Sequence, residues 1–287
     1  GAALESTMSR ITLACIQPPC LDEVSLSYQA DMLEVGLALL GEALKKSPAF
    51  CCLPEFFNVF GAPADNYCAL AENNAVPVRT RVSALAKAHS SHIILPLLER
   101  DGAGFYNRAY LIGPDGEPIG HYDKIHPTLA EREQLGVVGG KSIDVFETSH
   151  GRVAIPICYD IYFPELFAAL ALREPDILFF PSLQRSDHEP ASEALLKARA
   201  MDTKAYIARA SYGRRVDQPW KAGLMFGQSA IVHPDGTVLA NAGHYDGIAL
   251  AHIEVPFAWQ RQRCGGYPAE PVRRFLREDR RPDVYGE

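Results

Sequence analysis

Short apolar runs rich in β-branched residues recur along the chain, and longer segments with apolar residues at three- and four-residue spacing lie between them. The first pattern is typical of buried strands and the second of amphipathic helices. The runs that predict strands are residues 10–16, 49–53, 92–98, 108–112, 119–122, 153–157, 177–180, 205–210, 229–232, 237–239 and 248–252. The segments that predict helices are residues 25–45, 78–89, 164–172 and 192–204. This order of βα units and hairpins predicts a mixed α/β fold.

The segments between these elements predict the domain organisation. Pro-Asp-Gly stands between strand-like runs within residues 113–116 and 233–236, which predicts two hairpin turns. No low-complexity linker divides the chain, so we expect one domain over residues 8–287 with a C-terminal arm from about residue 256. The charged end of this arm fits either a frayed terminus or a segment that packs on another subunit. Residues 1–7 precede a Met that looks like a native start, and we expect them to be a remnant of expression.

Composition and charge exclude several classes of protein. With 47% hydrophobic and 22% charged residues the chain is an ordinary globular one. The net charge of -7, without basic runs that alternate with aromatic residues, argues against a nucleic-acid partner. The apolar runs are too short to span a bilayer and the start lacks a signal-peptide pattern, so we expect a soluble cytoplasmic protein. Seven cysteines without paired CxxC spacing predict reduced thiols rather than disulfides or a zinc site.

Three reactive side chains each follow a predicted strand. Glu55 follows the run 49–53, Lys124 follows 119–122 and Cys158 follows 153–157. In α/β sheets, ligands bind at the carboxyl ends of strands, where the following loops form a crevice. We therefore expect the three side chains to meet, provided that their strands are neighbours.

Taken singly, each of these residues also has an ordinary structural interpretation. A cysteine at the end of an apolar strand is usually a small buried hydrophobic residue, and a lysine is usually solvated. Glu55 is as consistent with a paired structural carboxylate as with a catalytic one, and its apolar neighbours would raise its proton affinity. The segment after Cys158 predicts a sharp passage into a helix with Pro164 in its first turn, which would place the thiol near the positive helix end and favour the thiolate.

Together, the three groups are sufficient for acyl transfer. A carboxylate can deprotonate the thiol, and a cation can stabilise the oxyanion that forms when the sulfur attacks a carbonyl carbon. The sequence therefore predicts Cys158 as nucleophile, Glu55 as proton shuttle and Lys124 as the oxyanion-stabilising cation.

The segments around these residues resemble the three motif blocks of the nitrilase, or carbon-nitrogen hydrolase, superfamily. The blocks are Leu53-Pro-Glu-Phe-Phe57, Asp123-Lys-Ile-His-Pro-Thr128 and Ile157-Cys-Tyr-Asp-Ile-Tyr-Phe-Pro-Glu165, in the same order and at similar spacing. The resemblance extends over essentially the whole chain. It implies a four-layer α-β-β-α sandwich that pairs into a homodimer or a higher homo-oligomer, with a Glu-Lys-Cys triad and no metal or organic cofactor.

The resemblance also implies further site residues. A second glutamate after the lysine supports the triad in many members; Glu131 is the candidate and Glu133 the competing alignment. The backbone N–H of Tyr159 is expected to help Lys124 bind the oxyanion. Other candidates for substrate binding lie near strand ends or just after the nucleophile: Tyr106, Asn107, Tyr162, Phe180 and Ser182. Arg185 could bind a substrate carboxylate, although its surroundings equally suggest a solvated loop.

Two clues to the substrate disagree. Cys-Tyr-Asp followed by Phe-Pro-Glu looks like the amidase-like branches, whereas the block that contains Lys124 is also similar to that of true nitrilases. We expect hydrolysis of a non-peptide carbon-nitrogen bond in a small amide or carbamoyl compound, through a thioester and with release of ammonia or an amine. A nitrile remains the alternative substrate.

The sequence also leaves functions of other classes open. A binding or scaffold protein could keep the fold without activity, but the intact Glu-Lys-Cys set argues against this. A redox sensor could use the adjacent Cys51 and Cys52, although alternation along a strand favours core positions for both. An acyltransferase would use the same acyl-enzyme with a different acceptor.

Overall fold

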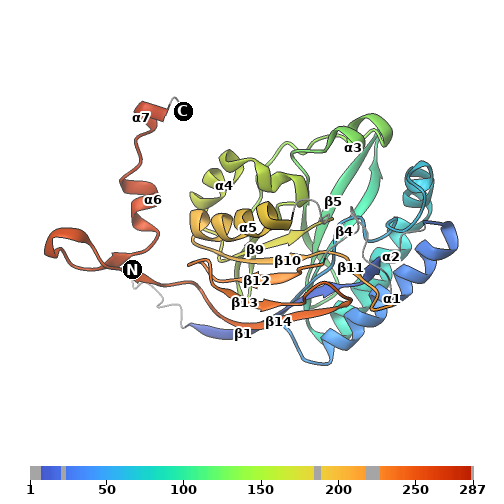
Figure 1. The fold of residues 1–287 in the computed structure, drawn as a ribbon, viewed down its shortest axis with the longest axis horizontal. Coiled ribbons are helices and arrows are strands. Elements are labelled where there is room, and N and C mark those ends of the chain that lie inside the picture. The colour runs from blue at the N-terminus through green and yellow to red at the C-terminus, as the bar shows by residue number, and fades with distance from the viewer. Residues whose placement is uncertain (1–7, 21–23, 184–188, 218–226, 286–287) are drawn as a thin grey trace.

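Two six-stranded mixed sheets form the centre of the computed structural model, which describes residues 8–20, 24–183, 189–217 and 227–285 (Figure 1). The first sheet has the order β14-β1-β3-β4-β5-β6, with β14 Gly247–Val255, β1 Ser9–Gln17, β3 Phe50–Cys52, β4 His92–Asp101, β5 Gly104–Ile112 and β6 Pro118–Asp123. The second has the order β13-β12-β10-β9-β8-β7, with β13 Val238–Asn241, β12 Ala230–Val232, β10 Tyr206–Ala210, β9 Ile177–Pro181, β8 Gly151–Ala154 and β7 Phe146–Thr148. Short strands β2 (Pro19–Cys20) and β11 (Gly213–Arg214) pair separately.

The two sheets pack face to face, and helices cover their outer faces. Helices α1 (Leu26–Leu44) and α2 (Tyr67–His89) lie on the first sheet, and α4 (Pro164–Ala171) and α5 (Glu189–Thr203) lie on the second. Strand β1 shows why both faces must be apolar: Leu13 and Cys15 face the other sheet, while Ala14 and Ile16 face the helices. The predicted four-layer α-β-β-α sandwich is confirmed.

Most predicted elements occur in the structure, including both hairpin turns. The segment 113–116 joins antiparallel strands β5 and β6, and 233–236 joins β12 and β13. In each turn the last glycine has a positive φ, 86° at Gly116 and 88° at Gly236, a backbone conformation that glycine adopts without steric cost.

Helix α2 begins at Tyr67, well before the predicted start at residue 78. Its buried stripe consists of Ala71, Ala75, Val78, Val82 and Ala86, so the first half contributes only alanines and gives a weak hydrophobic pattern. A proline also lies inside the helix at position 77.

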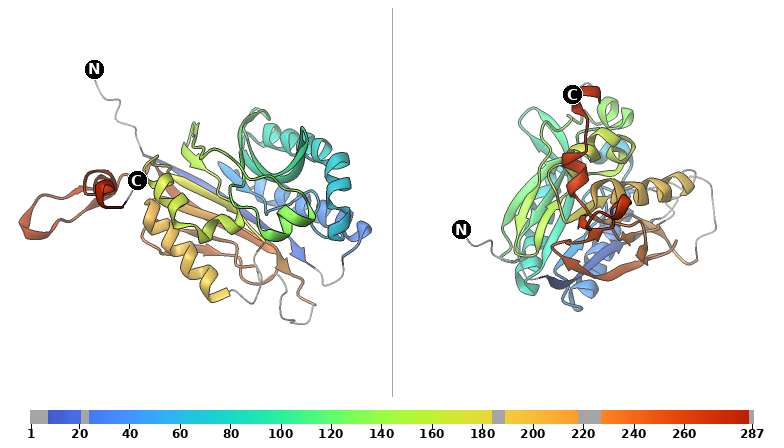
Figure 2. Two further views of the ribbon diagram at one scale, coloured as in Figure 1. Left: turned by 90° about the horizontal axis from the view of Figure 1, so that it is seen from above. Right: turned by 90° about the vertical axis from the view of Figure 1, so that its left-hand side faces the viewer.

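The C-terminal segment is an ordered arm that extends away from the sandwich (Figure 2). It contains a small hairpin of β15 (Gln260–Arg261) and β16 (Glu270–Pro271), followed by α6 (Arg274–Glu278) and α7 (Pro282–Tyr285). Arg273 fastens the arm to the body, because its Nη2 donates to the carbonyl oxygens of Pro175 at 2.6 Å and Lys204 at 2.9 Å. These two hydrogen bonds hold the base of the arm against the body.

None of the helices within the described ranges combines the length and apolar character needed to cross a membrane.

Candidate active site

Glu55, Lys124 and Cys158 all line one pocket of about 250 Å³. Glu55 follows β3 in the first sheet, and Lys124 directly follows β6 in the same sheet. Cys158 comes from the second sheet, where β8 ends at Ala154 rather than at the predicted residue 157. The segment from Ile155 to Ile157 still continues toward the pocket with both isoleucines buried. The structure thus brings together the three side chains that the strand ends predicted.

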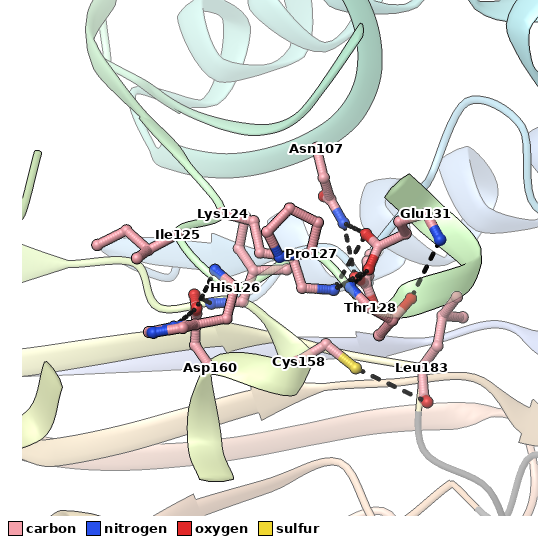
Figure 3. Close-up of polar contacts among 12 residues, drawn as sticks. Asn107, Lys124, Ile125, His126, Pro127, Thr128, Glu131, Cys158, Asp160 and Leu183 are labelled. Carbon is pink, nitrogen blue, oxygen red and sulfur yellow. Dashed lines mark hydrogen bonds and ion pairs between the residues drawn. The ribbon is translucent and has the colours of Figure 1, made fainter. Parts of the chain in front are cut away.

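Lys124 lies between two carboxylates and is almost fully buried, with 1% of its side chain exposed (Figure 3). Its Nζ donates to Glu55 Oε1 at 2.9 Å and to Glu131 Oε2 and Oε1 at 2.8 and 3.1 Å. Burial of one cation with two hydrogen-bonded carboxylates avoids the large free-energy penalty of an isolated buried charge.

Glu131 rather than Glu133 contacts Lys124. The short helix α3 (Leu129–Gln134) begins after Thr128, whose Oγ1 accepts a hydrogen bond from Glu131 N at 3.3 Å. In return, Glu131 Oε2 accepts from Thr128 N at 2.6 Å, which completes a capping box and fixes the carboxylate beside Nζ. Glu133 is exposed on the same helix.

The two carboxylates have opposite pKa shifts. Burial raises the pKa of Glu55, reinforced by the negative charge of Glu131 and only partly countered by Lys124. Burial also acts to raise the pKa of Glu131, but the charge of Lys124 and hydrogen bonds from Lys124, Thr128 and Asn107 outweigh it, so this pKa is lowered. A pair of acids whose environments separate their proton affinities is suited to distinct roles, with Glu131 ionised and Glu55 able to exchange a proton.

Cys158 begins a 3-10 helix, Cys158–Tyr162, and the α-helix itself starts only at Pro164. Its φ of 42° is unusual for a non-glycine residue, and Phe56, which follows Glu55, has a φ of 55°. Strained backbone of this kind is concentrated at functional sites. The Cys158 Sγ lies 3.9 Å from the carbonyl oxygen of Leu183 (Figure 3).

The expectation that a helix end favours the thiolate is wrong for the resting site. Burial raises the pKa of Cys158, and the neighbouring charge of Glu55 raises it further, while Lys124 only partly offsets both effects. The thiol is therefore protonated at rest and needs a base to become a nucleophile. Glu55 is placed for this, since its side chain interacts with the thiol.

The carboxylate of Asp160 joins the lysine segment to the cysteine turn. Its Oδ2 accepts from Ile157 N at 2.9 Å and from Tyr122 Oη at 2.7 Å. Its Oδ1 accepts from His126 N at 3.1 Å and lies 2.8 Å from His126 Nδ1 (Figure 3). The backbone N–H groups of His126 and Ile157 are thus bonded to one fully buried carboxylate, which holds the segment that carries Lys124 against the segment that carries Cys158.

Comparison with known proteins identifies the family. The sequence profile of the carbon-nitrogen hydrolases matches residues 12–258. The chain belongs to the carbon-nitrogen hydrolase family. The resemblance to the nitrilase superfamily that the three motif blocks indicated is thereby confirmed.

Relatives of this hydrolase include amidases. The omega-amidase NIT2 of Bos taurus is 32% identical over 243 residues, which covers 80% of this chain and 85% of the relative. A structure of a mutant Nesterenkonia amidase from the nitrilase superfamily matches with a TM-score of 0.76 at 22% identity over 96% of each chain. Nit3 of Saccharomyces cerevisiae matches with a TM-score of 0.71 at 23% identity over 86% of this chain and 91% of that one. Amidases are thus among the proteins to which this member of the carbon-nitrogen hydrolase family is similar.

Several residues expected to bind substrate in this hydrolase do not line the pocket. Phe180 is fully buried among the side chains that pack β9 against α4 and α5. Ser182 is also buried, and its backbone N donates to Ala210 O at 2.9 Å. Tyr106 lies against the guanidinium of Arg108, 5.2 Å from the ring centre. Arg185 lies outside the described residues.

The side chains of the remaining substrate candidates also lie outside the pocket wall. Tyr159 and Tyr162 are exposed at 37% and 41%, and their rings lie 5.5 Å apart. Asn107 is buried behind the pocket and donates to both Glu55 and Glu131. It therefore contacts the reactive groups of the hydrolase instead of lining the pocket.

The pocket wall comes mainly from residues that the sequence did not indicate. Apart from the reactive groups and Thr128, the residues that line it are Phe56, Ala64, Tyr67, Ala130, Gln134, Leu135 and Leu183. Phe56 could have been found, because it follows Glu55 within a motif block. The others lie on α2, on α3 or in connecting segments, where no pattern in the sequence marks them.

Proposed function

We propose that this chain hydrolyses small amides through a thioester on Cys158. The observation that carries the proposal is the convergence of Cys158, Glu55 and Lys124 on one pocket, with the pKa of Glu55 raised and that of Glu131 lowered. This arrangement supplies a nucleophile, a group that accepts and returns a proton, and a permanent cation.

In the first half of the reaction, Glu55 takes the proton of the Cys158 thiol as the sulfur attacks the amide carbonyl carbon. The carbonyl π electrons move to oxygen, and Lys124 and the backbone N–H of Tyr159 stabilise the oxyanion. Lys124 Nζ has three N–H donors and contacts Glu55 Oε1 and both oxygens of Glu131 in the resting site, so the donor in the longest contact, 3.1 Å to Glu131 Oε1, turns to this oxygen as the oxyanion forms. Collapse of the intermediate breaks the carbon-nitrogen bond, and Glu55 returns its proton to the departing nitrogen.

In the second half, water replaces the amine. Glu55 removes a proton from the water as its oxygen attacks the thioester, and the same two donors stabilise the second oxyanion. Collapse breaks the carbon-sulfur bond, and the proton passes from Glu55 to the sulfur. The carboxylic acid leaves and the resting thiol is restored.

The pocket wall favours a small acyl group without charge. Phe56, Tyr67, Leu135 and Leu183 present apolar surface, against which an unpaired carboxylate would be poorly solvated. Lys124 is the one Lys or Arg that lines the pocket within the described part of the chain, and two carboxylates already surround it. Structures of the Nesterenkonia amidase contain acrylamide in one case and the acetamide moiety of fluoroacetamide at the active-site cysteine in another, which supports small neutral amides here.

A substrate panel tests this proposal. We expect ammonia release from propionamide and butyramide, with kcat/KM roughly tenfold or more above that for succinamate, because the apolar wall disfavours its carboxylate. The panel also contains an N-carbamoyl amino acid and butyronitrile. Faster release from butyronitrile would instead identify a nitrilase, and faster turnover of succinamate would contradict the neutral acyl pocket. No release from any compound would contradict the hydrolase proposal.

Hydroxylamine distinguishes acyl transfer from hydrolysis in the same assay, since an acyltransferase releases hydroxamate with hydroxylamine but little acid with water.

Assembly into a homodimer or a higher homo-oligomer, and a cytoplasmic location, stay predictions. The anchored arm beside α4 and α5 supports the former.

A further inference from the structure

Asn107 bridges the two carboxylates of the site. It lies on β5, and its Nδ2 donates to Glu55 Oε1 at 2.7 Å and to Glu131 Oε1 at 2.7 Å. Lys124 Nζ is bonded to the same two oxygens. The backbone takes part as well, because Lys124 N donates to Asn107 O at 2.9 Å. One residue thus contacts every charged member of the site.

These bonds leave the two oxygens of Glu55 in different environments. The hydrogen bonds from Asn107 and Lys124 both end on Oε1. Oε2 is therefore the oxygen with free capacity toward the thiol of Cys158, with which the Glu55 side chain interacts. Without the second donor on Oε1, the carboxyl group could rotate about its terminal bond, which has only a broad torsional preference.

The chemistry of an amide suits this position. Its NH₂ group supplies two uncharged donors, so it can orient both carboxylates. The net charge of the site, which holds one cation and two acids, stays the same. An aspartate there would add a third acid, and a lysine would lower the proton affinity of Glu55. The Oδ1 of Asn107 is buried without a hydrogen-bond partner among the described residues. A buried oxygen without a hydrogen-bond partner lowers the stability of the folded protein. Its presence here therefore points to a role of Asn107 in the site.

We propose that Asn107 is a positioning residue for proton transfer, which holds Glu55 by Oε1 so that Oε2 receives the proton of Cys158. This inference rests on the proposed function, since it concerns the base step of that reaction. It replaces the expectation that Asn107 binds substrate.

The acid limb of a pH profile can report on Glu55 in this site. The other titratable groups around it are Lys124, Glu131, Cys158, Tyr67 and Tyr212. Burial raises the pKa of Tyr67 to about 12 and that of Tyr212 above its usual range. The pKa values of Lys124 and Cys158 are also raised, while that of Glu131 is lowered. Glu55 is therefore the carboxyl group of the site whose pKa is raised, and we assign the acid limb to it.

Two variants test the proposal: Asn107→Leu removes both donors at similar volume, and Asn107→Asp keeps the shape but has at most one donor. For both we expect kcat on butyramide to fall about 10- to 100-fold with KM within about threefold of wild type. The acid limb of kcat/KM should move to higher pH, because the Glu55 carboxylate loses a stabilising donor. Asn73→Leu, at an exposed position of α2, is the matched control and should change neither quantity.

Alkylation of Cys158 by iodoacetamide provides a readout that needs no substrate. The Glu55 carboxylate takes the thiol proton as the sulfur displaces iodide, so alkylation followed by mass spectrometry should slow at least about tenfold at neutral pH in both Asn107 variants. Unchanged alkylation and an unchanged acid limb in folded variants would overturn the proposal. If the wild type hydrolyses no amide but the Asn107 variants still slow alkylation, the proposed function fails while the positioning role stands.

Discussion

Cys158→Ala is expected to reduce ammonia release from every amide that the wild-type chain hydrolyses by roughly 10⁵-fold or more, which is below detection in a steady-state assay. Alanine has no atom that can form the thioester, and no other described thiol lines the pocket. The measurement is the initial rate on butyramide at matched protein concentration, with circular dichroism to verify the fold.

The control for this variant is Cys68→Ala. Cys68 is partly exposed, and its Sγ lies 3.5 Å from the carbonyl oxygen of Leu135 in the pocket wall. It tests whether loss of a nearby thiol is enough to lower the rate, and we expect less than a threefold change. Residual activity of Cys158→Ala above about 1% of wild type would contradict the role of Cys158 as nucleophile.

Lys124→Met is expected to lower kcat/KM by at least about 10²- to 10³-fold, because it removes the cation that stabilises the oxyanion. It should also lower the free energy of unfolding by about 3–5 kcal/mol at neutral pH, because Glu55 and Glu131 remain buried without a counter-charge. Urea denaturation at several pH values measures the second effect.

The stability deficit of Lys124→Met should shrink as the pH falls. Without the cation, burial raises the pKa values of both glutamates above those in the unfolded chain, so the folded state binds more protons and acidification stabilises it. Lys45→Met is the control, since Lys45 pairs with Glu42 on the exposed surface and should contribute at most about 1 kcal/mol. A deficit below about 1 kcal/mol in Lys124→Met, or one that grows on acidification, would contradict the proposed charge balance.

The convergence of Glu55, Lys124 and Cys158 could be predicted from sequence because each of them follows a run of residues that predicts a strand. The ends of neighbouring strands lie at a shared edge of the sheet. Glu55 follows β3 and Lys124 follows β6, so their proximity could be predicted before any contact was known. The sequence alone did not decide whether Glu131 or Glu133 lies beside Lys124. The capping box with Thr128 distinguishes them, because it fixes Glu131 beside Nζ.

The substrate pocket could not be found in the same way. Phe180 lies near the end of a strand, but successive side chains of a strand point to opposite faces of the sheet. Phe179 therefore faces the other sheet, and Phe180 faces α4 and α5. The wall residues Ala64 and Leu135 lie in irregular or short segments, whose course depends on tertiary packing. The raised pKa of Cys158 was missed for a related reason, since burial and the charge of Glu55 arise only when two sheets meet.

The central claim is that Cys158 carries the acyl group during turnover. Acid quenching of the enzyme during steady-state hydrolysis of butyramide, followed by mass spectrometry of the intact protein and its peptides, tests this claim directly. We predict a butyryl thioester on the peptide that contains Cys158, which hydroxylamine removes, and none in Cys158→Ala. Unmodified protein during continued turnover at quench times that resolve single cycles, or an acyl group on another residue, would contradict the account.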